Sequence, residues 1–126
     1  MIVVFNLENR TMKVQVLITT MVLMMSCKSD VINKENDFMV YGNCNMCKST
    51  IEKAVDVDGV VKADWNKDTK MMRVSFDSTK TSQQNIEKMI SECGYDTEMF
   101  RAADEKYNAL HECCHYERKP ETQEIR

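Results

Sequence analysis

Two cysteines, Cys44 and Cys47, are the residues of this chain best suited to chemistry, and they lie in the stretch Gly42-Asn43-Cys44-Asn45-Met46-Cys47. At this spacing two thiolates can chelate one ion, and thiolate pairs suit soft ions, chiefly Cu(I), Zn(II) and their heavier relatives. A helix is expected to begin beside the pair, and the positive end of a helix favours the thiolate form of a nearby cysteine. The pattern therefore predicts Cys44 and Cys47 as the principal metal ligands.

The same spacing also occurs in redox dithiols and disulfides, so Cys44 and Cys47 have an alternative chemistry. A thioredoxin-like enzyme needs a cis-proline that faces its dithiol. The only proline of this sequence is Pro120, which lies in the tail. Metal ligation is therefore our favoured interpretation of the pair.

The C-terminal part of the chain carries a second concentration of potential ligands. Four soft or borderline donors fall within five residues: His111, Cys113, Cys114 and His115. If a helix over residues 102–114 includes this cluster, His111, Cys114 and His115 share one face at a spacing that can grip one ion. We predict either a second site or a lid that completes the coordination of the first pair. The alternative is a helix that docks on the domain through Tyr107, Leu110 and Cys114.

A further cysteine, Cys93, falls on the apolar stripe of a second expected helix. Cysteine is often fully buried in proteins, and a buried, inert thiol is the role expected here. A metal-ligand role for Cys93 is the alternative.

The first 27 residues predict a secretory signal. Residues 14–25 form an apolar run after Lys13, and this run is too short for a membrane-spanning helix, which needs about 20 residues. The run ends in Ser26-Cys27, which resembles the lipobox of bacterial lipoproteins. That resemblance implies cleavage before Cys27, lipidation of its thiol and a periplasmic or outer-membrane lipoprotein. A plain signal peptide with an incidental Cys27 is the alternative, and Met1 and Met12 are both candidate starts.

Composition narrows the classes of function. The chain has 126 residues, with 17 basic residues (Lys and Arg) against 20 acidic ones and a formal net charge of −3. Because the sequence shows no basic block, nucleic acid is not expected as a partner. No paired carboxylates argue for acid–base catalysis, so we expect no enzymatic activity.

The order of the expected elements predicts an α+β fold. These elements are a polar tether over 28–36, a strand around Phe38, a helix over 47–55, a hairpin within 61–76, a second helix ending near Cys93 and a last strand over 95–100. Thr81 and Gln84 offer a capping box for the second helix. Within residues 37–100 this βαββαβ order predicts a ferredoxin-like sandwich, with one antiparallel sheet and two helices on one face. A helix and a polar tail over 101–126 are expected to follow.

With its elements in that order, the chain from 37 to 100 resembles the heavy-metal-associated domain family, which includes copper chaperones, modules of metal-pumping ATPases and periplasmic mercury-binding proteins. The resemblance rests on Gly42, Cys44, Cys47, Ile51-Glu52-Lys53-Ala54, Gly59-Val60-Val61, Val74-Ser75-Phe76-Asp77 and Cys93-Gly94-Tyr95-Asp96. The family usually has Gly-Met-x-Cys-x-x-Cys on its first loop, whereas this loop lacks the methionine and is one residue shorter. The resemblance implies that Tyr95 lies near the metal loop and shields the thiolates from water.

The motif and the resemblance together predict an exported metallochaperone or metal scavenger, which passes a soft ion to transport machinery in the cell envelope. Cu(I) is the expected ion, with Hg(II) and Zn(II) as alternatives. The expected partner is a metal transporter or an efflux component, and the expected state is a monomer, with a metal-bridged dimer as the alternative. Two other functions stay open: a thiol–disulfide redox protein, and an adaptor that docks a membrane transporter without binding metal.

Overall fold

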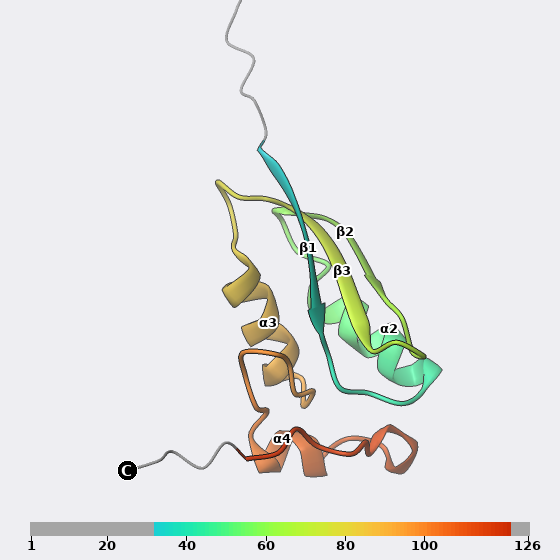
Figure 1. The fold of residues 1–126 in the computed structure, drawn as a ribbon. Helices are drawn as coiled ribbons and strands as arrows, with labels where there is room; N and C mark the ends of the chain where they lie inside the picture. The colour runs from blue at the N-terminus through green and yellow to red at the C-terminus, as the bar shows by residue number, and fades with distance from the viewer. Residues whose placement is uncertain (1–31, 122–126) are drawn as a thin grey trace, which may run out of the picture. The chain divides into compact units, whose positions relative to one another are not determined.

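A computed structural model describes residues 32–121 of the chain. Its elements, drawn in Figure 1, are β1 (Asn33–Met39), α2 (Asn45–Ala54), β2 (Val60–Trp65), β3 (Met71–Asp77), α3 (Gln83–Glu92), α4 (Asp104–Asn108) and a 3-10 turn (Glu112–Cys114). Within these residues, every helix is too short or too polar to span a membrane. The expected signal and its Cys27 lie outside the described residues.

Three antiparallel strands form the sheet in the order β1-β3-β2, so that β3 lies in the middle. Along β3, Met72, Val74 and Phe76 are buried whereas Arg73 is exposed, as expected of a sheet with one covered face. Residues 33–36 pair with β3, although the sequence pattern placed them in a tether. Their side chains are mostly exposed, so this end of β1 depends on main-chain pairing and gives no apolar signal.

Helices α2 and α3 supply the apolar side chains that complete the core. Ile51 of α2 and both Ile86 and Ile90 of α3 are fully buried in one cluster with Phe38 and the inward side chains of β3. Helix α3 begins after Ser82, whose side chain accepts a hydrogen bond from the backbone N–H of Asn85. The predicted capping box was therefore wrong by one residue.

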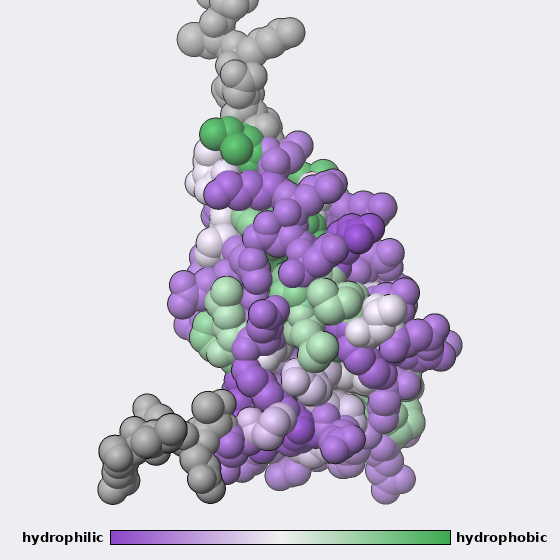
Figure 2. Space-filling view, in the orientation of Figure 1, coloured by the Kyte–Doolittle hydropathy of each residue, from purple (hydrophilic) through white to green (hydrophobic). Residues whose placement is uncertain are grey.

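The surface in Figure 2 is mostly hydrophilic, with small hydrophobic areas between polar side chains. Most large apolar side chains lie in the core, but Val61 is an exception, with 63% of its surface exposed. Val61, Ala63 and Trp65 alternate in the sequence with Lys62 and Asp64, a pattern that by itself would turn Val61 inward. A bulge between Val60 and Lys62 shifts the register of β2 against β3, and such a bulge re-aims side chains locally.

The fourth strand expected over residues 95–100 is reduced to a single bridge between Val40 and Thr97. Two further main-chain hydrogen bonds, from Tyr41 to Asp96 and from Glu98 to Met39, hold this segment beside the end of β1. The segment then turns, because the N–H of Thr97 donates to the carbonyl of Phe100 at 2.7 Å. It thus lies where the last strand of a ferredoxin-like sheet belongs without extending the pairing.

The continuous helix predicted over residues 102–114 is wrong. The segment forms the short α4, an extended residue at His111 (φ −59°, ψ 146°) and then the 3-10 turn. Helix α4 lies directly on Gly94, which has φ +101° and would place a Cβ 2.7 Å from the carbonyl oxygen of Lys106. Tertiary packing of this kind overrides helix propensity, and the chain leaves the helix so that Cys114 and Tyr116 enter the core.

Candidate metal site

The cysteine pair lies where a loop becomes helix α2. Cys44 has an extended backbone (φ −139°, ψ 168°) and caps the helix, and its sulfur accepts a hydrogen bond from the backbone N–H of Cys47 at 3.2 Å. A sulfur at this position meets the positive end of the helix. The local fold therefore places the Cys44 sulfur against a backbone N–H donor at the start of α2.

The two sulfurs of the pair face each other. Cys44 Sγ and Cys47 Sγ are 2.7 Å apart, and both cysteines are free. Cys47 is fully buried and Cys44 is half-buried. The pair thus presents two facing sulfurs, of which that of Cys44 is the one that solvent reaches.

Trp65, the last residue of β2, lies beneath the cysteine loop. Its side chain is fully buried, and its indole N–H donates to the carbonyl of Val40 at 3.0 Å. A Cβ at Gly42 would come within 2.9 Å of the indole ring, so glycine lets the loop backbone rest on the ring. The loop lacks the methionine of the family pattern and is supported here by an aromatic ring. Sequence reasoning treated Trp65 only as a strand residue, although the single tryptophan was a visible signal.

A third sulfur, that of Cys114, joins the pair from far along the chain. Cys114 Sγ lies 3.6 Å from Cys44 Sγ, and the three sulfurs all lie within 4.8 Å of one another. Among residues 32–121, this is the one group of three or more histidine, cysteine or carboxylate side chains whose ligand atoms lie this close together. Burial raises the pKa of the Cys114 thiol to about 12, and the neighbouring thiols of Cys44 and Cys47 add to the effect. Without metal, Cys114 is therefore a neutral thiol at pH 7.

Tyr95 closes the site on the core side, near the sulfurs as the resemblance implied. The side chain is fully buried, and its hydroxyl has no hydrogen-bond partner among the described residues. The thiols of Cys47 and Cys114 lie beside it, and burial, together with these thiols, raises the pKa of Tyr95 far above its ordinary value. The hydroxyl is therefore a neutral donor that lacks an acceptor.

The other predicted ligands do not join these three sulfurs. His111, Cys113 and His115 are exposed, although Cys113 Sγ lies 3.9 Å from Cys114 Sγ. His111 Nδ1 lies 3.2 Å from Cys113 Sγ, and the His115 ring stacks on Tyr107 with centroids 5.0 Å apart. Cys93 is also exposed, because α3 ends one residue before it. The prediction of a buried thiol at Cys93 was wrong.

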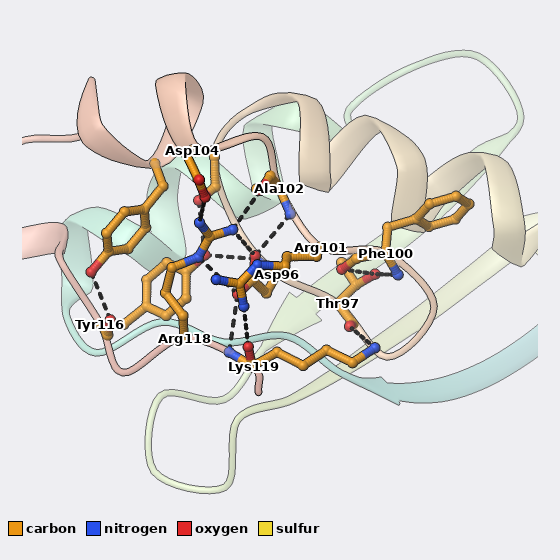
Figure 3. A network of polar contacts seen from close by, with 11 residues as sticks. Asp96, Thr97, Phe100, Arg101, Ala102, Asp104, Tyr116, Arg118 and Lys119 are labelled. Atoms are coloured by element: carbon orange, nitrogen blue, oxygen red, sulfur yellow. Dashed lines mark hydrogen bonds and ion pairs between the residues drawn. The ribbon is translucent and has the colours of Figure 1, made fainter. Parts of the chain in front are cut away.

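The polar network in Figure 3 fixes the C-terminal segment, residues 101–121, on the domain. Asp96 is fully buried and accepts hydrogen bonds from Arg118 Nη2 at 2.8 Å and from the backbone N–H groups of Ala102 at 2.8 Å and Lys119 at 3.0 Å. Burial alone would raise the pKa of Asp96, but Arg118 and the backbone donors outweigh burial and hold that pKa below its ordinary value. Asp96 therefore stays ionised and keeps Arg118 in place.

Tyr116 adds a second attachment. Its hydroxyl donates to the carbonyl of Gly94 at 2.9 Å and accepts from the backbone N–H of Asp96 at 2.7 Å. Its ring stacks on Tyr95, with centroids 5.8 Å apart. Sequence reasoning missed these attachments, since no local pattern connects Asp96 with Arg118, 22 residues away.

Comparisons with known proteins agree with this geometry. A model of the heavy-metal-associated domain matches residues 39–96. The mercuric transport protein periplasmic component of Pseudomonas aeruginosa is 40% identical over 53 residues, which are 41% of this chain and 58% of that protein. The chain thus spans less than two thirds of that relative. Copper chaperone CopZ of Staphylococcus aureus strain JH9 is 34% identical over 55 residues, which are 43% of this chain and 81% of the chaperone.

Solved structures support the same assignment. Oxidized MerP from Ralstonia metallidurans CH34 superposes with a TM-score of 0.50 at 34% identity, covering 52% of this chain and 94% of that one. A putative copper-ion-binding protein from Bacillus anthracis superposes with a TM-score of 0.52 at 24% identity, covering 55% and 100%, and supports the fold alone. The predicted ferredoxin-like α+β class is therefore confirmed. Since the match to CopZ extends over most of that chaperone, this chain belongs to the heavy-metal-associated domain family.

Proposed function

We propose that this protein binds one soft metal ion between the thiolates of Cys44 and Cys47 and passes it to a metal transporter. The observation that carries the proposal is the pair itself, with two sulfurs 2.7 Å apart at a helix N-terminus. The names of two relatives support it, since one is called a copper chaperone and the other a component of mercuric transport. Cu(I) is the first candidate ion, and Hg(II) and Zn(II) are the others.

Transfer of the ion needs no catalysis. An acceptor thiolate binds the ion, a three-coordinate intermediate forms, and one donor sulfur leaves. A second exchange releases the other donor sulfur, so metal–sulfur bonds are exchanged and no electrons are transferred. Because Cys44 is half-buried and Cys47 fully buried, an acceptor displaces Cys44 first. We propose a transporter or efflux component of the cell envelope as the acceptor.

Anaerobic titration of the full chain with Cu(I), Hg(II) or Zn(II), followed by native mass spectrometry, tests the binding step. We expect one ion per chain, with Cu(I) and Hg(II) held more tightly than Zn(II). Zinc prefers four tetrahedral ligands, whereas soft ions accept fewer thiolates. Retention of none of the three ions would refute the proposal. Turnover on a disulfide substrate would then favour the redox alternative.

We also propose that the protein is exported and anchored by lipid at Cys27. The support is the apolar run that ends in Ser26-Cys27, together with the word periplasmic in the name of the mercuric relative. A fatty-acid analogue should label the membrane-associated protein in a bacterial host, and Cys27→Ala should abolish the label. Stable anchoring needs more than one acyl chain. Wild-type protein that stays unlabelled and is released with the soluble fraction would contradict the lipid anchor.

A further inference from the structure

The sulfur of Cys114 lies beside the proposed binding pair, although it comes from the C-terminal segment, outside the matched domain at residues 39–96. We propose that Cys114 is a third thiolate ligand, so that the site holds a divalent soft ion in a trigonal arrangement of three sulfurs. This inference rests on the proposed function, because it presumes that Cys44 and Cys47 bind the ion. A third sulfur raises the coordination number of the ion from two to three, and the coordination number decides which class of ion the site prefers.

The distances between the sulfurs favour three ligands over two. With the metal–sulfur bond of about 2.3 Å found in zinc thiolate sites taken as the scale, a linear two-sulfur site needs its sulfurs about 4.6 Å apart, and a trigonal site needs about 4.0 Å. Cys44 and Cys47 start at 2.7 Å, whereas Cys44 and Cys114 start at 3.6 Å. The trigonal arrangement therefore needs the smaller opening of the pair, and Cys114 already lies close to the required distance.

The hydroxyl of Tyr95 is a second, independent observation. A buried hydroxyl without a partner is unfavourable, and this one lies fully buried beside the thiols of Cys47 and Cys114. Metal-bound thiolates are hydrogen-bond acceptors with negative charge. Binding a metal through Cys114 would therefore give the Tyr95 hydroxyl the acceptor that it lacks in the metal-free protein.

The attachments of the C-terminal segment hold Cys114 at this position. Directly after it, the carbonyl of His115 accepts a hydrogen bond from Asn43 Nδ2 at 2.7 Å, which ties the segment to the cysteine loop itself. Tyr116 and Arg118 follow, with their hydrogen bonds to the Gly94–Asp96 turn. Cys114 is thus held from the loop on one side and from the core on the other.

The charge of the site selects a divalent ion. Three thiolates carry a charge of −3, so a monovalent ion leaves −2 in a largely buried site, whereas a divalent ion leaves −1. Unpaired buried charge is costly. Two cations close to these cysteines in sequence are already paired, Lys48 with Glu52 and Asp64 and Arg118 with Asp96 and Asp104. We therefore expect Cys114 to bind together with the pair when the ion is Hg(II), and to stay a thiol when the ion is Cu(I).

X-ray absorption spectroscopy of the full wild-type chain with one equivalent of Hg(II) tests the inference directly, and two variants provide the comparison. We expect three sulfur ligands in the wild type, two in Cys114→Ser, and three in the control Cys93→Ser, whose exposed thiol lies outside the three-sulfur cluster. Native mass spectrometry of the same samples should show one ion in a single chain. Three sulfurs found only in a complex of two chains would overturn the inference.

Affinities provide the second readout. Losing a direct ligand should cost at least the 10–100-fold that removing an outer-shell partner typically costs, so Cys114→Ser should weaken Hg(II) binding by about this factor or more. The same substitution, Cys114→Ser, should change the affinity for Cu(I) by less than about tenfold, because only Cys44 and Cys47 bind that ion. Two sulfurs in the wild type, with Hg(II) still bound to the pair, would refute the third ligand and leave the proposed function intact. No Hg(II) bound through Cys44 and Cys47 would refute both.

Discussion

Serine in place of Cys44 or Cys47 is expected to lower the affinity for Cu(I) or Hg(II) by more than the roughly 10–100-fold that an outer-shell substitution costs. A hydroxyl is a hard, weak ligand for a soft ion, and the loss of either sulfur removes the two-thiolate chelate. The effect should be larger in the double variant, since neither thiolate of the pair then remains. Competition with a chromophoric chelator under anaerobic conditions measures these affinities.

The fold of the variants should persist, which separates lost ligands from lost structure. Serine is a preferred N-cap residue, so Cys44→Ser keeps the cap on α2. Cys93→Ser is the matched control, because Cys93 is a free, exposed thiol that lies apart from the three-sulfur cluster. Its affinity and its circular dichroism spectrum should equal those of the wild type. A double variant of Cys44 and Cys47 that binds as tightly as the wild type would remove this site from consideration.

The parts of the site that the sequence predicted are local. Cys44 and Cys47 are three residues apart, and both the loop and the helix that position them follow from neighbouring residues. Neighbouring residues also predict the alternation of buried and exposed side chains along β3 and the row of buried apolar side chains on one face of α3. Periodicity of side chains reports such features because it depends only on the geometry of one element.

The parts that the sequence did not predict depend on contacts between distant residues. Cys114 reaches Cys44 across 70 positions, after the chain has left α4 at a point that no helix-stop residue marks. Helical spacing instead grouped Cys114 with His111 and His115, which are exposed. Cys93 was placed inside because it continues an apolar stripe, but the helix ends just before it. Where an element ends is decided by what packs against it, and a single sequence does not contain that information directly.

Methionine in place of Arg118 is expected to lower the free energy of unfolding by about 3–5 kcal/mol, the usual cost of removing one partner of a buried ion pair. Asp96 is fully buried and pairs with Arg118, whose side chain is only 13% exposed. Methionine retains much of the volume of the arginine stem but leaves the carboxylate without its cation. Chemical denaturation of the metal-free protein at pH 7 measures the change.

Arg73→Met is the matched control for Arg118→Met, because it removes the same charge from a pair that faces solvent. Arg73 and Asp37 form two hydrogen bonds, but their side chains are 72% and 45% exposed. Exposed ion pairs contribute little to stability, so this variant should unfold almost as the wild type does. Equal losses in the two variants would show that Arg118 acts as an ordinary surface charge.

The difference in the free energy of unfolding between wild type and Arg118→Met should also depend on pH. The protonation of the Asp96 carboxylate determines whether this difference grows or shrinks in acid. Its pKa in the folded wild type lies below the ordinary value, so the stability it contributes is present above the unfolded pKa of about 3.9 and is lost as pH falls through the folded pKa. The unfolded pKa is common to both proteins, so the gap between the two denaturation curves depends on the folded ones. Without Arg118, burial of Asp96 is opposed only by the backbone donors, and the folded pKa of Asp96 in Arg118→Met is higher than in the wild type. The gap should therefore shrink as pH falls from the higher of these two pKa values to the lower. A gap of constant size over this range would mean that Arg118 stabilises the segment through packing on Tyr107, whose ring it covers at 4.8 Å, and not through the charge of Asp96.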